Sequence, residues 1–409
     1  MGQKFQFPKG FLWGAATSAH QVEGGNHNDW TEWEKSPKRI AELKTRGLNP
    51  DDYISGKACD HYNRFREDFD IAKSLGHNAH RFSIEWSRIE PEEGKFDEKE
   101  IEHYRQVLLA LKERGLEPVV TLYHYTLPLW FVRKGGWLNS HAPMMFLNYV
   151  SKLADEYGSI VKIWVTQNEP ETVARESYLI GWRPPHKTSF LSARRCLHIL
   201  LEAHKLAYDV IKKVDLDSQI GIAETLVYFD LYKNTLLNKL TLKLIKWWRN
   251  NPLFSEFIKY SDFVGLEYYY HTRVRFNPFT SKWGIQFNEN KKISDMGWEL
   301  FPQGLLPILV EMKKFDKPVY ILEHGLADAK DQNRSWYIKE SLKFIAQAMQ
   351  KGVDVRGYFH WSLLDNFEWQ GGFGRRFGLV EINYKTFERE IRPSALEYKK
   401  IITLNSIEI

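Results

Sequence analysis

The feature that most constrains the fold is an unbroken alternation of short apolar runs with longer amphipathic stretches along all 409 residues. No Pro/Ser-rich linker interrupts it. Runs of this length, several of them rich in Val, Ile, Phe and Tyr, are typical of strands buried on both faces of a parallel sheet. The runs predicted as strands are 11–16, 78–84, 117–123, 163–168, 219–223, 262–268, 318–322 and 355–361.

The stretches between the runs have apolar residues at helical spacing. Asp97 is placed to cap one of them, and Gly76 and Gly115 each follow a helical pattern, where glycine is favoured. The predicted helices are 59–75, 98–114, 142–157, 192–213, 236–259, 303–314, 333–350 and 393–402. Eight strand–helix pairs in sequence predict an α/β fold, a single (β/α)8 TIM barrel over residues 1–409, rather than a doubly wound sheet.

Composition narrows the class of protein. The formal charge of +5 comes without a Lys/Arg run or a nucleic-acid motif, so no nucleic-acid partner is expected. The most basic stretch, 239–249, could lie on a membrane, but we favour an outer barrel helix whose apolar stripe faces inward. Cys59 and Cys196 form no disulfide framework, and the N-terminus lacks the apolar stretch of a signal peptide. We therefore expect a cytoplasmic protein without a membrane partner; the oligomeric state is left open.

Polar and aromatic residues follow the predicted strands, at the end where a (β/α)8 barrel builds its active site. Glu169 and Glu323 each come directly after an apolar run and just before Pro170 or Gly325, which suits a side chain held at a turn. A pair of glutamates on separate strands is what glycoside hydrolysis requires, one as acid and the other as attacking carboxylate. The alternative is that they are two ordinary members of the 52 Asp and Glu residues, most of them solvated.

Five motifs carry a resemblance. They are FLWGAATSAHQVEG (11–24), RFSIEWSRIEP (81–91), TQNEP (166–170), YILEHG (320–325), and WSLLDNFEW with RRFGL (361–369 and 375–379). In this order, across nearly the whole chain, they resemble glycoside hydrolase family 1. The resemblance implies a retaining β-glycosidase that acts on β-D-glucosides, with β-D-galactosides and β-D-fucosides as further substrates. No cofactor and no metal are implied.

The resemblance also implies roles for single residues. Glu169 would be the acid/base and Glu323 the nucleophile, and Arg81 and Tyr269 would contact that nucleophile and keep it ionised. Opposite environments would then push the pKa values of the two carboxyls apart. The positions that match sugar-binding residues are Gln21, His124, Asn168, Glu368 and Trp369, with Trp361 as a platform and Phe377 as a further wall.

Several positions depart from the family pattern. Glu267 stands where the family usually has Asn, and it would raise a neighbouring carboxyl pKa unless His271 or Arg273 neutralises it. Tyr125 replaces a tryptophan, which removes stacking area, and His324 adds a titratable group beside the proposed nucleophile.

Two alternatives stay open beside the glycosidase. The first is a 6-phospho-β-glycosidase, which Glu368 disfavours by repelling phosphate, although Arg375 and Arg376 lie nearby in the sequence. The second is a sugar-binding barrel with weak or no activity, whose signature would be the loss of one of the two glutamates. Both glutamates are present.

Overall fold

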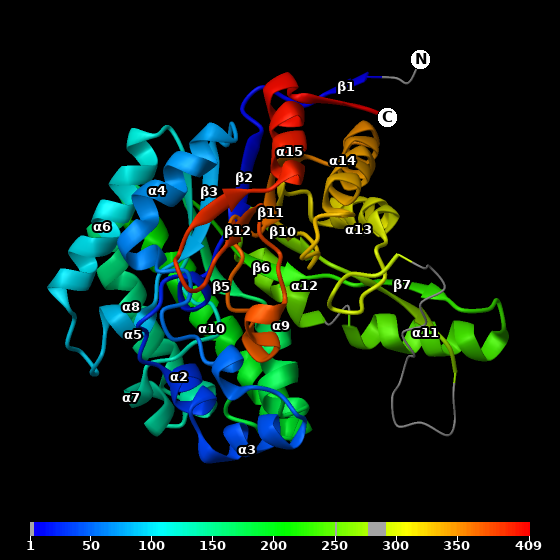
Figure 1. Cartoon of the computed structure of the whole chain (residues 1–409). Coiled ribbons are helices and arrows are strands. Elements are labelled where there is room, and N and C mark those ends of the chain that lie inside the picture. Colours follow the sequence, from blue (N-terminus) through cyan, green and yellow to red (C-terminus); the bar gives the residue numbers. More distant parts are fainter. Residues whose placement is uncertain (1–3, 250–251, 277–291) are drawn as a thin grey trace.

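The computed structural model describes residues 4–249, 252–276 and 292–409 (Figure 1). Its centre is a closed parallel barrel with the strand order β10-β11-β2-β3-β4-β5-β6-β8. The barrel strands are β2 (Leu12–Ala16), β3 (Ala79–Ser83), β4 (Glu117–Thr121), β5 (Ile163–Asn168), β6 (Gln219–Thr225), β8 (Val264–Tyr268), β10 (Val319–His324) and β11 (Val355–Trp361). Each corresponds to a predicted strand, so the predicted (β/α)8 barrel is confirmed.

Helices surround the barrel and bury their apolar stripes against it. They are α4 (His61–Ser74), α6 (Glu98–Glu113), α8 (Ala142–Tyr157), α10 (Phe190–Val214), α12 (Pro252–Lys259), α13 (Leu305–Met312), α14 (Arg334–Gln350) and α15 (Pro393–Leu404). The Asp97 carboxylate caps α6 by accepting the amide of Lys99 at 2.9 Å, as its position predicts. Gly76 and Gly115 end α4 and α6 with φ of +82° and +66°, a conformation that favours glycine.

The single helix predicted over 236–259 is wrong, because the described chain contains two helices there, α11 (Leu236–Arg249) and α12. Pro252, which lacks an amide hydrogen, begins α12; residues 250–251 lie outside the described residues. Helix α11 packs against β7 (Tyr228–Leu231) and β9 (His271–Val274) outside the barrel, where Figure 1 shows it projecting from the barrel.

The expected inward orientation of the apolar stripe of α11 is also wrong. Leu236, Leu240 and Leu244 are 73%, 56% and 45% exposed, whereas Asn238 is buried. The reason is that the narrow β7–β9 pair, rather than the barrel, supplies the surface beneath the helix. The side chains of 247–249 lie outside the described residues. Among the described helices, none is long and apolar enough to span a bilayer.

Shorter elements, which the periodicity does not predict, complete the chain. Strand β1 (Lys4–Gln6) pairs with β14 (Ser406–Glu408), so the two ends lie together (Figure 1), and β12 (Val380–Ile382) pairs with β13 (Arg389–Ile391). The short helices are α1 (Ala19–Val22), α2 (Asp29–Glu34), α3 (Pro37–Thr45), α5 (Trp86–Ile89), α7 (Leu129–Arg133) and α9 (Pro170–Val173). Short 3-10 helices occupy Pro50–Tyr53, Gly136–Leu138, Pro302–Gly304, Lys313–Phe315 and, with a kink at Gly372, Trp369–Gly374; Ala174–Leu179 is a π-helix.

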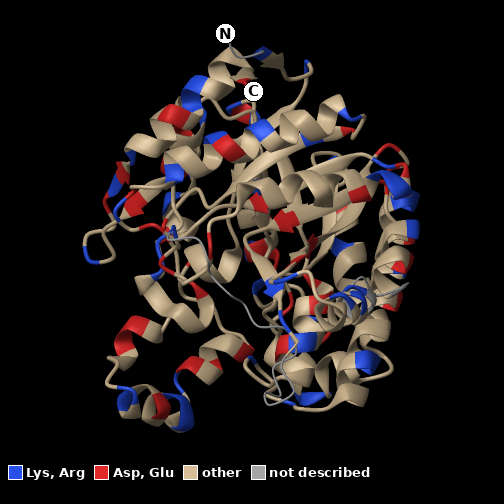
Figure 2. Cartoon of the chain, turned by 90° about the vertical axis from the view of Figure 1, so that its right-hand side faces the viewer, with Lys and Arg blue, Asp and Glu red and all other residues tan. Residues whose placement is uncertain are grey.

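The core has two layers, as side-chain alternation along parallel strands requires. One layer fills the barrel and includes Val119, Val165, Leu322 and Phe359; the other lies between strands and helices. Gly265 lets two strands approach closely, since a Cβ there would lie 2.1 Å from the Ile222 carbonyl oxygen. On the outer helices, positive and negative residues are intermixed (Figure 2).

Candidate active site

A cavity of about 120 Å³ lies at the carboxyl ends of the barrel strands. Its lining includes Gln21, His124, Asn168, Glu169, Tyr269, Glu323, Trp361, Glu368, Trp369 and Phe377. These are all the candidate site residues except Arg81, which lies beneath the cavity and contacts Glu323. A larger cavity of about 620 Å³ is lined by the opposite strand ends, at Leu12, Glu117 and Gln219 among others, and in this fold that end serves stability.

Glu323 comes from the end of β10 and is 4% exposed. One of its carboxylate oxygens accepts from Arg81 Nη1 at 2.6 Å, and the other accepts from the Tyr269 hydroxyl at 2.5 Å. Burial raises the pKa of Glu323, and Arg81 and Tyr269 act against that rise by stabilising the ionised form. The resulting environment holds a carboxylate in one orientation.

Glu169 follows the last residue of β5 and adopts a left-handed backbone with φ of +46°. Its carboxylate accepts from the hydroxyls of Tyr125 and Thr225. Burial would raise the pKa of Glu169, but hydrogen bonds from Glu267, Thr225 and Tyr125, together with the charge of Arg183, outweigh it and lower the pKa. The two pKa values therefore shift in the directions opposite to those expected, because hydrogen bonds outweigh burial at Glu169 whereas burial prevails at Glu323.

Glu267, from β8, is fully buried between the other two glutamates. Its carboxyl lies 3.0 Å from Arg81 Nη1 and 3.2 Å from the Thr225 hydroxyl, and it is within hydrogen-bonding reach of both Glu169 and Glu323. Burial and the charges of Glu323 and Glu169 raise the pKa of Glu267 well above its ordinary value.

Of the two alternatives for Glu267, pairing with His271 or Arg273 is not observed among the described residues. His271 and Arg273 both contact Glu299 instead, His271 at 3.3 Å. The physical reason is the position of the strands. Glu267 faces the barrel interior, whereas β9, which carries His271 and Arg273, lies outside the barrel beside β7. The cation that contacts Glu267 is Arg81, from across the barrel on β3.

Polar and aromatic side chains form the rest of the cavity wall. Gln21 Nε2 donates to the Glu368 carboxyl at 3.2 Å and to the Phe367 carbonyl at 2.9 Å. The His124 ring lies nearly parallel to Trp361 and Trp369, with centroids 6.2 and 6.0 Å away. Burial and the charge of Arg81 lower the pKa of His124 well below its ordinary value. Planar faces and neutral hydrogen-bonding groups thus surround the carboxylates.

Glu368 is the acidic residue of this wall. Burial, followed by the negative charge of Glu323, raises the pKa of Glu368 to about 8. Arg81 also contacts Asn168, the last residue of β5, directly before Glu169 in the chain. Phe377 meets Tyr269 edge to face at 6.1 Å.

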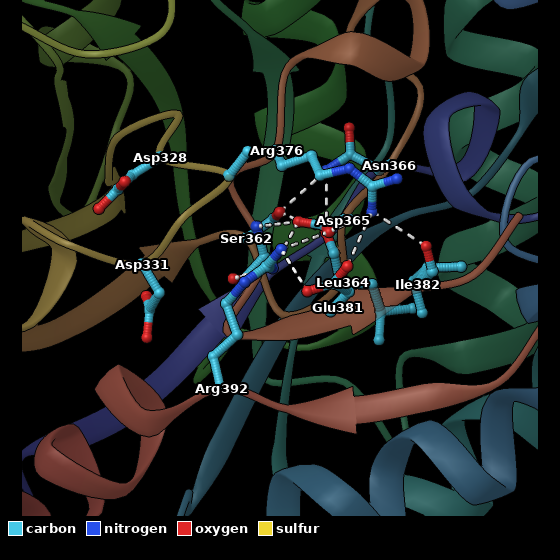
Figure 3. Close-up of polar contacts among 12 residues, drawn as sticks. Asp328, Asp331, Ser362, Leu364, Asp365, Asn366, Arg376, Glu381, Ile382 and Arg392 are labelled. Carbon is cyan, nitrogen blue, oxygen red and sulfur yellow. Dashed lines mark hydrogen bonds and ion pairs between the residues drawn. The ribbon is translucent and has the colours of Figure 1, made fainter.

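A buried ion-pair network fixes the segment that carries Trp361, Glu368 and Trp369 (Figure 3). Asp365, fully buried, accepts from Arg392 Nη1 and Nη2 at 2.8 and 2.9 Å and from Arg376 Nη1 at 2.8 Å. A two-pronged contact of this kind fixes geometry as well as adding energy. The Gly378 amide also donates to Asp365, at 2.9 Å, which ties in the loop that carries Phe377.

His324 does not face the cavity, so the expectation of a titratable group beside Glu323 is wrong. Because successive strand side chains alternate, His324 points outward into the layer between the barrel and α14. There it is fully buried, contacts the hydroxyls of Tyr358 and Ser341 at 3.0 and 3.2 Å, and stacks on Tyr337. Burial lowers the pKa of His324 to about 3.

Sequence reasoning missed some residues of the site and misjudged another. Thr225 belongs to the two residues by which β6 outruns its predicted end, and a longer predicted strand would have included it. Arg183, from the segment after β5, lies 4.4 Å above the Tyr125 ring and pairs with Glu176 at 2.6 Å, with no sequence signal. Tyr125 is the residue that was misjudged: it still provides an aromatic wall, with its ring edge to face with Trp369 at 5.0 Å. It also adds a hydroxyl that donates to Glu169.

Arg375 and Arg376 are not among the residues that line the cavity. Arg375 donates to the Asp295 carbonyl, and Arg376 is held by Asp365 and by the Ile382 carbonyl. Their proximity in the sequence therefore does not supply a phosphate site beside Glu368, and the 6-phospho alternative is not favoured.

Comparison with known proteins agrees with this geometry. The family model described as Glycosyl hydrolase family 1 matches residues 3–241 and 253–407. The chain is 34% identical to β-glucosidase A of Thermotoga maritima, over 98% of this chain and 99% of that protein, and 29% identical to a β-galactosidase of Pyrococcus woesei over 98% of each.

Solved structures give the same result. A family 1 β-glucosidase from Thermotoga maritima superposes with a TM-score of 0.90 at 33% identity, covering 99% of both chains. A β-glycosidase from Pyrococcus horikoshii gives 0.89 at 35% identity, covering 100% of this chain and 97% of that one. The chain therefore belongs to glycosyl hydrolase family 1 and is a glycoside hydrolase of the β-glucosidase type.

Proposed function

We propose that the enzyme hydrolyses β-D-glucosides, and also β-D-galactosides and β-D-fucosides, with retention of configuration through a covalent glycosyl-enzyme intermediate. The observation that carries the proposal is the environment of Glu323. Its two oxygens are each held by a strong donor, Arg81 at 2.6 Å and Tyr269 at 2.5 Å, which is what an oriented, ionised nucleophile needs. Glu169 faces the same cavity from a different strand.

In the first step Glu323 attacks the anomeric carbon. The bond to the leaving oxygen breaks, and Glu169 gives its proton to that oxygen, so that a neutral alcohol departs. Glu323 becomes an ester and loses its negative charge. Arg81 and Tyr269 fix the direction of attack, because the Glu323 oxygens cannot rotate without giving up one of those hydrogen bonds.

In the second step Glu169, now ionised, takes a proton from water. The oxygen of that water attacks the same carbon from the side that the alcohol has left, and the ester bond to Glu323 breaks. Two inversions give net retention. Tyr125 and Thr225, which both donate to Glu169, stabilise the ionised form that this step requires.

Recognition of the sugar is proposed to use the cavity wall. Gln21, His124, Asn168, Glu368 and Trp369 offer hydrogen-bonding atoms, while Trp361 and Phe377 offer apolar ring faces. Sugar hydroxyls need donors and acceptors at fixed positions, whereas the C–H face of a pyranose packs on an aromatic ring. Support from relatives comes from the Thermotoga maritima β-glucosidase, whose structures include complexes with glucoimidazole and with deoxynojirimycin.

Rates on a panel of aryl β-glycosides test the substrate class. We expect hydrolysis of 4-nitrophenyl β-D-glucoside, β-D-galactoside and β-D-fucoside. Little activity is expected on their 6-phosphates, because Arg375 and Arg376 are held by other groups and do not line the cavity. Glu323→Gln, which keeps the size of the side chain, should lose several orders of magnitude in kcat. Wild-type activity in that variant would contradict the assignment of the nucleophile.

Trapping the intermediate tests the mechanism. A 2-deoxy-2-fluoro-β-D-glucoside with a good leaving group should add one fluoroglucosyl unit to the intact protein, and peptide mapping should place it on Glu323. Proton NMR of a reaction in progress should show the β-anomer of the released sugar first. An α-anomer formed first, or label on another residue, would overturn the proposed mechanism.

A further inference from the structure

Three buried carboxyls meet at the base of the cavity, although retaining hydrolysis needs only two. Glu267 lies between the other two and is within hydrogen-bonding reach of each. We infer that Glu267 holds the proton of the resting site, shares it with Glu169 directly and across the Thr225 hydroxyl, and becomes the counter-ion of Arg81 when Glu323 is esterified. The inference rests on the proposed roles of Glu169 and Glu323.

Counting hydrogens places one proton on the two carboxyls that share the Thr225 hydroxyl. Thr225 has a single hydroxyl hydrogen for both contacts, and the contact with Glu169 is the shorter one. The remaining contact of Thr225 Oγ1, 3.2 Å from Glu267 Oε2, is then satisfied if Glu267 donates. Two carboxyls in mutual hydrogen-bonding contact likewise require a proton between them.

The donors around each carboxyl lead to the same result. Glu323 receives Arg81 at 2.6 Å and the Tyr269 hydroxyl, and Glu169 receives two hydroxyls. Glu267 shares Arg81 at the longer distance of 3.0 Å and has no hydroxyl of its own. The least stabilised carboxylate is the one that keeps a proton.

The charges that face Glu267 come from several elements. They are Arg81 on β3, Glu169 after β5, and Glu323 on β10, with the phenols of Tyr125 and Tyr269 close by. Arg81 is the guanidinium that contacts Glu267, and the charge of Arg183 acts on Glu169. Three carboxyls that meet in a buried site nevertheless repel one another. Like charges this close cannot all ionise, and the raised pKa of Glu267 agrees with that.

The proton balance closes over one turnover. At rest Glu267 is neutral and Glu169 is ionised; Glu267 then gives its proton to Glu169, directly or by exchange through the Thr225 hydroxyl. Glu169 passes that proton to the departing oxygen while Glu323 becomes a neutral ester, and Arg81 pairs with the ionised Glu267. Water later returns a proton to Glu169, Glu323 regains its charge, and the proton moves back to Glu267.

The pH dependence of kcat/KM separates this role from a structural one. In the wild type, loss of the last shared proton leaves three adjacent carboxylates, whereas in Glu267→Gln it leaves two. The basic limb of the profile should therefore move to lower pH in Glu267→Gln, by about one unit or more. A merely structural role would lower kcat or raise KM and leave the limb in place. An unmoved limb, or one moved to higher pH, would overturn the inference.

Infrared difference spectroscopy tests the resting proton without any substrate. Wild type minus Glu267→Gln at pH 7 should show the carbonyl band of one neutral carboxylic acid. The matched control is Asp68→Asn on α4, which removes a fully buried carboxylate held by Arg389 at 2.9 Å and should remove carboxylate bands only. Carboxylate bands in the wild type minus Glu267→Gln spectrum would show that Glu267 is ionised and would contradict the inference.

The two readouts separate the proposals from each other. A neutral-acid band in an enzyme that hydrolyses no β-glycoside would refute the proposed function and leave the proton assignment standing. Should Glu267→Gln fold poorly, Glu267→Asn removes the same proton and has the same expected band and limb shift. The assignment would be overturned if Glu267→Asn kept full activity, the neutral-acid carbonyl band of the wild type and an unmoved basic limb of the kcat/KM profile.

Discussion

Removal of the Tyr269 hydroxyl is the most local test of how the site holds Glu323, its proposed nucleophile. Tyr269→Phe deletes one oxygen, which lies 2.5 Å from Glu323 Oε2, and keeps the ring that packs near Phe377. The Arg81 contact to the other oxygen of Glu323 remains. The substitution therefore removes one donor from the ionised carboxyl and little else.

The size and sign of the effect follow from that contact. A hydrogen bond to a charged group contributes about 1.5–3 kcal/mol, and one pKa unit corresponds to ~1.4 kcal/mol. Because Tyr269 donates to the ionised form, its loss raises the pKa of Glu323, by roughly one to two units. The nucleophile must be ionised, so the acidic limb of kcat/KM against pH should move upward by that amount.

The assay is kcat/KM for 4-nitrophenyl β-D-glucoside across the stable pH range, read by a stopped, alkaline detection of the phenol. Tyr157→Phe is the matched control, since its hydroxyl donates to the Ile101 carbonyl at 2.7 Å on the outer helices. That control should leave both limbs in place. An acidic limb unmoved in Tyr269→Phe, with kcat lowered uniformly, would refute the reasoning that Tyr269 acts through the charge of Glu323.

Further predictions concern stability and its pH dependence. Asp365→Asn breaks a buried double pair and should cost about 3–5 kcal/mol, roughly 4–6 °C in Tm for this length. The matched control is Asp354→Asn, which removes only the exposed pair with Arg356 and should cost under ~0.5 kcal/mol. Thermal melts decide between these outcomes, and equal losses would contradict the burial argument. His324 has a pKa of about 3 when folded, so below pH ~6.5 it takes up a proton only on unfolding, which destabilises the folded wild type as the pH falls. His324→Gln lacks this effect, and its Tm relative to wild type should therefore rise as the pH falls from 7 to 4. Glu368 has a folded pKa of about 8, so the stability it contributes is complete below its unfolded pKa of ~4.3 and is lost as the pH rises toward 8. The Tm of Glu368→Gln relative to wild type should therefore rise over that pH range. For either variant, a difference in Tm from wild type that stays constant with pH would contradict the assignment.

The pattern of apolar residues along the chain was enough to predict the barrel and the place of its site. Short apolar runs separated by helical periodicity leave few arrangements that bury both faces of every strand, and a closed ring of eight is the one observed. Residues that follow those runs must then lie at one rim. Glu169, Tyr269 and Glu323 could therefore be found from their positions, since strand order alone brings them to one cavity.

The partners of these residues depend on how the strands are placed in space. A one-residue step along a strand turns a side chain to the other face, which is why His324 is a buried, uncharged neighbour of Tyr337 while Glu323 faces the cavity. Glu267 pairs with Arg81 across the barrel, a contact 186 residues apart in the chain that no local pattern encodes. Proton location depends on such distances between strands, because charge interactions are set by separation in space and by burial.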